Sequence, residues 1–123
     1  MHIDPNPEAI ATARPDELIL MLFEGAVRFG RESVAQLDAD QDAAAAQSVA
    51  RVRAILTELD ESLDRDAGAI SRHLAAIYDY LIRRLSAPVV ERDTILEVIG
   101  DVETLAQTWA VLVERQDAEL AAV

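Results

Sequence analysis

The sequence predicts an all-α fold, an antiparallel up-down four-helix bundle with a mobile N-terminal arm. Apolar residues recur at alternating spacings of three and four along most of the chain, which is the period of helices with one buried face. Glycine and proline number only four each, too few for the turns of a β fold. The links between periodic segments are short, which makes neighbouring helices antiparallel. We expect a single domain over residues 1–123, with a flexible arm at 1–14, the bundle at 15–115 and a frayed tail at 116–123.

The first two helices are expected at about 15–37 and 42–65. Pro15 suits the first turn of a helix, because a missing N–H costs nothing there, and the acidic residues after it stabilise the positive end of the helix dipole. Gly68 is a natural stop for the second helix. The apolar residues of that helix form a heptad seam: Ala45, Val49, Val52, Leu56, Leu59 and Leu63.

The third helix is expected at about 69–85, where Pro88 and the loop at 87–92 end it. Its predicted buried face consists of Ile70, Leu74, Ile77, Leu81 and Leu85. Asp93 is the expected cap of the fourth helix, which ends near Arg115. The seam of this helix has the same rhythm: Ile95, Ile99, Val102, Ala106, Trp109 and Val113.

Composition excludes several classes of partner. The chain has 23 acidic and 11 basic residues and a net charge of −12, so it lacks the basic face that binding to nucleic acid or an anionic membrane requires. It has no cysteine, which excludes disulfides and thiolate metal sites and fits a reducing cytoplasm. The longest apolar run, 18–23, is too short to span a bilayer, and no signal peptide precedes it. We expect a cytoplasmic protein without membrane insertion.

The first and third helices carry more apolar residues than one buried face can hold. The run at 18–23 surrounds the first helix, and the third has Tyr78, Tyr80 and Ile82 beyond its predicted seam. Such a helix is either enclosed on all sides or forms a docking surface, and both explanations stay open. A docking surface would be a groove for a partner helix, partly closed by the N-terminal arm.

The sequence contains no constellation of catalytic or metal-binding residues. There is no Glu-x-x-His pair, no glycine-rich phosphate loop and no serine paired with a histidine on one helix face. We therefore expect no enzyme activity, no metal and no cofactor. His73 leaves one alternative, a histidine phosphotransfer domain, although Lys and Gly are missing from the positions after it.

Four segments resemble the FliS family of flagellar secretion chaperones. They are 12–29 (TARPDELILMLFEGAVRF), 58–64 (ELDESLD), 77–85 (IYDYLIRRL) and 93–109, and together the match spans about 9–112. The resemblance implies a cytoplasmic helical bundle that binds the disordered C-terminal segment of flagellin and prevents premature polymerisation. It also implies delivery of flagellin to the export gate protein FlhA.

The chain departs from the family pattern at several positions. Arg14 replaces the usual Ser cap of the first helix, a loss of about 1 kcal/mol, and Phe23 and Glu24 replace the usual Tyr-Asp pair. No aromatic residue precedes Phe23, and the loop at 87–90 lacks the usual Asn. These departures bear on the contacts of the arm more than on the fold.

The excess apolar residues of the first and third helices are the candidate contacts for a partner. Binding must order a disordered segment at about 2–5 kcal/mol and still leave about 8 kcal/mol for a micromolar complex, which only a long apolar track can supply. The residues expected to bind the partner are Ile10, Leu18, Met21, Leu22, Tyr78 and Ile82. The chief alternative function is a helical adaptor or anti-regulator that binds a folded partner.

Overall fold

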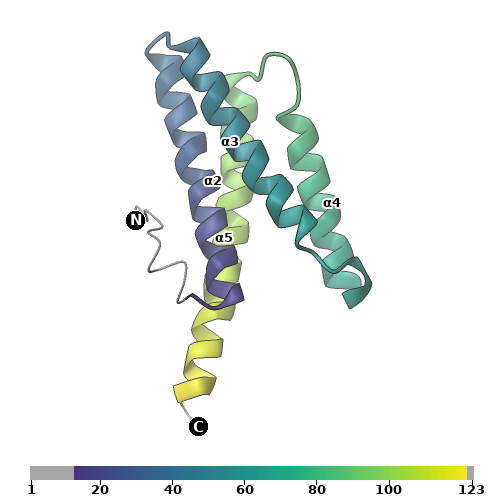
Figure 1. The fold of residues 1–123 in the computed structure, drawn as a ribbon. Coiled ribbons are helices and arrows are strands. Elements are labelled where there is room, and N and C mark those ends of the chain that lie inside the picture. Colours follow the sequence, from purple (N-terminus) through teal and green to yellow (C-terminus); the bar gives the residue numbers. More distant parts are fainter. Residues whose placement is uncertain (1–12, 122–123) are drawn as a thin grey trace.

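The computed structural model describes the backbone of residues 13–121 and their side chains apart from 112 and 116–121. Within these residues it contains α-helices and one short 3₁₀ helix and no strand. The order is α2 (Pro15–Asp38), α3 (Asp42–Glu61), η1 (Arg65–Ala67), α4 (Ala69–Arg84) and α5 (Arg92–Ala121). Successive α-helices run in opposite directions (Figure 1). The predicted all-α bundle is confirmed, and the backbone of α5 stays helical beyond Arg115 to Ala121.

The first turn of α2 is capped by its own acidic residues. The backbone N–H of Arg14 donates to Glu17 Oε1 at 3.1 Å, and Asp16 Oδ1 accepts from the N–H of Glu17 at 3.0 Å. The Arg14 guanidinium in turn donates to Asp16 through Nε at 3.2 Å. These contacts offset the cost expected from replacing the usual Ser, since two backbone donors at the helix start are satisfied.

The connection between α3 and α4 differs from the sequence prediction. Helix α3 ends at Glu61 rather than near residue 65, because Asp64 accepts a hydrogen bond from the N–H of Asp66 at 3.0 Å and starts η1. Gly68 does not end α3 but caps the start of α4, with a φ of 128°. That φ lies where a Cβ would be strained, so glycine is required at this corner.

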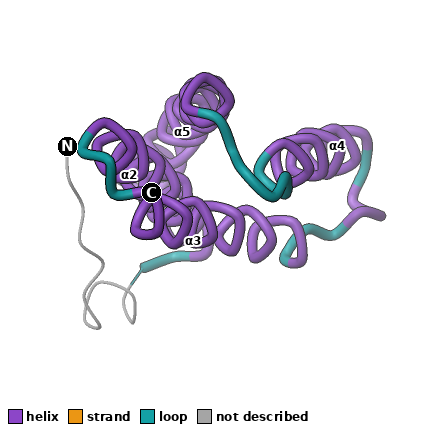
Figure 2. The backbone as a smooth tube through the Cα atoms, turned by 90° about the horizontal axis from the view of Figure 1, so that it is seen from above, coloured by secondary structure: helices purple, strands orange, loops and turns teal. Residues whose placement is uncertain are grey.

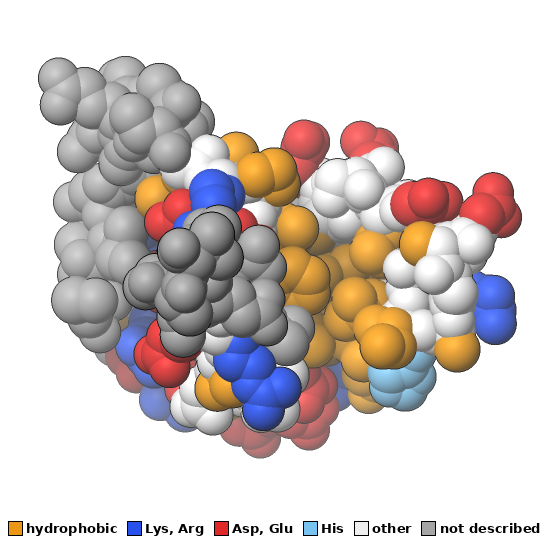
Figure 3. Space-filling view, turned by 90° about the horizontal axis from the view of Figure 1, so that it is seen from below, with side chains coloured by type: hydrophobic (Ala, Val, Ile, Leu, Met, Phe, Trp, Pro, Cys, Tyr) orange, Lys and Arg blue, Asp and Glu red, His pale blue; other side chains and the backbone are white. Residues whose placement is uncertain are grey.

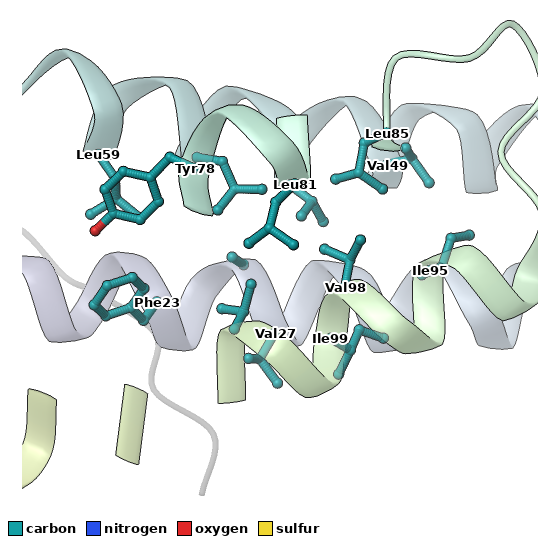
Figure 4. Packing of buried hydrophobic residues seen from close by; sticks show 14 residues of the cluster. Phe23, Val27, Val49, Leu59, Tyr78, Leu81, Leu85, Ile95, Val98 and Ile99 are labelled. Atoms are coloured by element: carbon teal, nitrogen blue, oxygen red, sulfur yellow. The ribbon is translucent and has the colours of Figure 1, made fainter. Parts of the chain in front are cut away.

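The core lies between the inner faces of the α-helices (Figure 4). Its most enclosed members are large apolar side chains from every α-helix: Phe23, Leu56, Leu81, Leu85 and Val102, each 0–1% exposed. The Phe23 ring lies 6.4 Å from that of Tyr78 and 6.1 Å from that of Trp109, edge-on to the latter. The Trp109 indole N–H also donates to the carbonyl of Asp16 at 2.9 Å, so this cluster joins α5 to the start of α2.

Helix α4 stands apart from the other three. Seen from above, α2, α3 and α5 lie together, and α4 lies beside α3 on the far side from α2 (Figure 2). The upper end of α4 is held by a hydrogen bond from Arg53 Nη1 to the Leu85 carbonyl at 2.8 Å. An ion pair of Arg84 with Glu97 joins it to α5. Helix α4 is therefore tied to the bundle at its top, and its side toward α5 is open to an apolar groove.

Helices α2 and α5 approach closely at Gly30, and this contact gives a stability prediction. A Cβ built on Gly30 would lie 2.6 Å from Ile99 Cγ1, so we expect Gly30→Ala to lower the free energy of unfolding by about 1–3 kcal/mol through overpacking. Gly100, which has nothing within 4 Å of its Cβ position, is the matched control. Gly100→Ala should raise the free energy of unfolding by about 0.5–1 kcal/mol. Urea unfolding followed by circular dichroism measures both, and equal effects would refute the close contact.

Candidate functional site

An open apolar groove lies between α4 and α5. It has a volume of about 420 Å³ and is lined by Ala76, Ile77 and Tyr80 from α4 and by Asp101, Thr104 and Leu105 from α5. The lower end of the molecule shows hydrophobic side chains gathered between α4 and the rest of the bundle (Figure 3). Tyr80 is 50% exposed, which leaves a large aromatic side chain without cover in the monomer. The groove suits an apolar ligand with a few polar contacts at its α5 wall.

The buried face of α4 agrees with the sequence prediction except at Ile70 and Tyr78. Tyr78, Leu81 and Leu85 are 0–2% exposed, whereas Ile70 is 80% exposed and Ile77 is half-buried. The predicted face is therefore confirmed at Leu74, Ile77, Leu81 and Leu85, which are buried or packed against the core, and wrong at Ile70. Tyr78, expected beyond this face, is buried against Phe23, and Ile77 both packs against the core and lines the groove.

Comparison with known proteins assigns a family. A family model described as "Flagellar protein FliS" matches residues 6–116. The chain belongs to the FliS family. A flagellar secretion chaperone FliS of Bacillus subtilis is 32% identical over 89% of this chain and 84% of its own length. The flagellar secretion chaperone FliS of Salmonella typhimurium is 31% identical over 82% of this chain and 78% of its own length. That of Campylobacter jejuni is 32% identical over 77% of this chain and 77% of its own length.

The residues expected to bind a partner in this FliS chain fall into different environments. Ile10 lies outside the described residues. Tyr78 is 2% exposed and belongs to the core, so its prediction as a surface contact is corrected: its ring is needed to fill the interior. Leu22 and Ile82 are half-buried against the core.

Leu18 and Met21, near the start of α2, are also half-buried. None of the five described candidates lines the α4–α5 groove. Their part in partner binding stays a prediction.

Sequence reasoning missed most of the groove. The sequence marks Tyr80 as surplus and places Ile77 on the buried face, where the structure also packs it against the core, but neither Ile77 nor Leu105 is predicted to line a groove. Nothing in the spacing of the fourth helix separates Leu105 from its seam neighbours, because the groove depends on how far α4 stands from α5.

Among the described residues of this FliS-family chain, no group of three or more His, Cys, Asp or Glu is placed to hold a metal ion. His73 is exposed on α4. No helix in the described part of the chain is both long and apolar enough to cross a membrane.

The buried Tyr78 gives a prediction for alkaline pH. Burial, with a contribution from the Asp60 carboxylate, raises the pKa of Tyr78 to about 12, whereas a tyrosine in an unfolded chain titrates near 10. The folded state binds the phenolic proton more tightly than the unfolded state does, so the protonated Tyr78 hydroxyl stabilises the fold. This contribution to the free energy of unfolding is complete below pH 10 and is lost as the pH rises from 10 to about 12. We expect the free energy of unfolding to fall by about 2–3 kcal/mol across that window.

Urea titrations at several alkaline pH values measure the effect. Tyr78→Phe keeps the ring and removes the titrating hydroxyl, so its free energy of unfolding should fall much less over the same window. Parallel losses in the wild type and in Tyr78→Phe would assign the alkaline instability to other groups.

Proposed function

We propose that this FliS-family chain is a flagellin-specific export chaperone. In this proposal it binds the disordered C-terminal segment of flagellin through the α4–α5 groove and prevents premature polymerisation in the cytoplasm. It then delivers flagellin to the export gate protein FlhA. The observation that carries the proposal is an apolar groove left open on the bundle of a FliS-family chain whose curated relatives are named flagellar secretion chaperones.

The lining of the groove supports a polypeptide client. Ile77, Tyr80 and Leu105 supply apolar contacts, and Asp101 and Thr104 supply polar ones on one wall. The Thr104 hydroxyl donates to the carbonyl of Gly100 at 3.1 Å, and its oxygen keeps a lone pair that can accept from a peptide N–H. Half-exposed tyrosines are common anchors in interfaces because they bury a large area at little entropic cost.

The energetics require contacts beyond this groove. A micromolar complex needs about 8 kcal/mol net, and ordering the segment costs about 2–5 kcal/mol more. With about 1.5–3 kcal/mol for each apolar side chain buried, the complex must bury roughly four to nine side chains. The α4–α5 groove has three apolar side chains larger than alanine, so the segment extends past it. Leu18 and Met21 on α2 remain the candidates for the additional contacts.

Calorimetric titration of the purified chain with a flagellin C-terminal peptide tests the proposal. We expect a heat of binding with a dissociation constant in the micromolar range and a mobility shift of the complex. A stoichiometric amount of the chain should also slow filament growth from flagellin monomers. Absence of heat and of a mobility shift at tens of micromolar would remove the chaperone function and favour an adaptor that binds a folded partner.

A further inference from the structure

A second groove lies at the opposite, upper end of the bundle. It has a volume of about 610 Å³ and lies between the end of α2, the first turns of α3 and the loop before α5. Its lining includes three apolar side chains that are 2–5% exposed, Ala45, Val49 and Ile95. Val89, from the loop, also lines the groove and is 80% exposed. An exposed valine beside a groove lined mainly by apolar side chains is typical of a docking surface.

The groove carries opposite charges at its two ends. Asp42, Val49 and Arg53 line it along one face of α3, with Asp42 at the helix start and Arg53 eleven residues later. At 1.5 Å per residue, the two charged positions are about 16 Å apart, too far to pair with each other. Most of the side chains that line the hollow between them are apolar, and Ser86 adds a hydroxyl.

Arg53 is half-buried and lacks an acidic partner among the described residues. Within the described part of the chain, its guanidinium makes one hydrogen bond, from Nη1 to the Leu85 carbonyl. By contrast, Arg31, Arg84 and Arg92 each pair with a carboxylate, in a chain with twice as many acidic as basic residues. A guanidinium half withdrawn from water gains most from an anionic partner that reaches it through the groove.

We propose that this upper groove binds an apolar segment of a second polypeptide, independently of the client in the α4–α5 groove. The segment carries an acidic side chain that pairs with Arg53 and, about 16 Å away, a basic side chain that faces Asp42. In extended form this is a stretch of about five or six residues. A fatty acid would satisfy Arg53 but would direct its apolar tail toward the Asp42 carboxylate, so opposite charges at the two ends favour a polypeptide.

The test uses two capped heptapeptides and backbone amide NMR of the full chain. The first probe, Lys-Ser-Leu-Ser-Leu-Ser-Glu, places both charges and both leucines on one face of an extended strand. Its charged positions lie about 20 Å apart, and the long Lys and Glu side chains can bend inward to the distance of about 16 Å that separates Arg53 and Asp42. The second has Gln at both ends. We expect the charged probe to shift the amides of Ala46 and Val89 and to bind about tenfold more tightly than the Gln probe.

Three variants locate the site. The Arg53→Glu variant should no longer bind the charged probe and should instead bind a probe with Lys at both ends. Ala46→Glu places a charge at an exposed position of the groove and should weaken binding about tenfold. Ala54→Glu adds the same charge at an exposed position of α3 outside the groove and should leave binding unchanged. Because Ala46→Glu alters an exposed helical residue, it keeps the test valid if Arg53→Glu misfolds.

Several outcomes would overturn the proposal. They are equal binding of both probes, equal effects of the Ala46 and Ala54 variants, and amide shifts confined to residues around Tyr80. Displacement of the charged probe by decanoate would assign the groove to a fatty acid. Self-association that Ala46→Glu abolishes would assign it to a second copy of the chain. Tyr80→Glu, which alters the other groove, should leave this binding intact, so failure here is distinct from failure of the chaperone function.

Discussion

Replacement of Phe23 by alanine should lower the free energy of unfolding by about 3–5 kcal/mol, the largest stability effect that we expect from a single substitution. The Phe23 side chain is 0% exposed, and its ring contacts both Tyr78 and Trp109. Truncation would therefore leave a cavity between α2, α4 and α5 and remove two aromatic contacts. Because domains of this size are stable by about 5–15 kcal/mol, the variant should be partly unfolded at moderate urea concentrations.

Urea unfolding followed by circular dichroism gives the free energies, and Trp109 fluorescence reports on the cavity directly. Tyr80→Ala is the matched control, because it truncates an aromatic side chain of similar size that is 50% exposed on α4. It should lower the free energy of unfolding much less than Phe23→Ala. Comparable losses in the two variants would mean that Phe23 does not hold the helices together.

The two helices with a single apolar phase could be predicted from the sequence. In α3 the seam residues Ala45, Val49, Val52, Leu56 and Leu59 are all buried, as expected, and Leu63, just beyond the end of the helix, is half-buried. In α5 the predicted seam is also confirmed, with four residues buried and Ala106 and Trp109 packed against the core. In both helices the seam follows one unbroken stripe, although α5 also buries Val98, which the seam does not include.

The buried face of α4 could be predicted only in part. Leu74, Ile77, Leu81 and Leu85 are buried or packed against the core, as expected, whereas Ile70 is exposed and Tyr78 is buried. Tyr78 packs against the Phe23 ring, which lies on a distant helix, so the spacing within α4 does not signal its burial. The role of Gly68 could not be predicted for a different reason, because the hydrogen bond of Asp64 that ends α3 early is local turn chemistry with no apolar signal.

The groove was not predictable because it is a property of two helices. Ile77 comes from α4 and Leu105 from α5. The space between them depends on the contacts that hold the upper end of α4, namely the hydrogen bond of Arg53 to Leu85 and the ion pair of Arg84 with Glu97. The sequence indicated an excess of apolar side chains but not their location. A surplus of this kind therefore predicts a docking surface, but it does not identify the residues that form the surface.

Tyr80→Glu should weaken binding of the flagellin C-terminal peptide by about a hundredfold, the largest functional effect that we expect. The substitution removes an aromatic anchor from the α4–α5 groove and places a carboxylate where the client buries apolar side chains, with the Asp101 carboxylate on the opposite wall. An unpaired charge enclosed by the client has no compensating contact there. The free energy of unfolding should change little, because half of the Tyr80 side chain already faces water.

Leu96→Glu is the matched control for this prediction. Leu96 is 42% exposed on α5 and does not line the groove, so the variant carries the same added charge and loses an apolar side chain of comparable exposure. Calorimetric titration should give wild-type affinity for Leu96→Glu and little or no heat for Tyr80→Glu at the same concentrations. If both variants bind the peptide as the wild type does, the client lies elsewhere and the half-buried residues of α2 become the first place to look. If both lose binding equally, the added negative charge on an already acidic chain is responsible, and an increase in salt concentration should then restore the affinity of both.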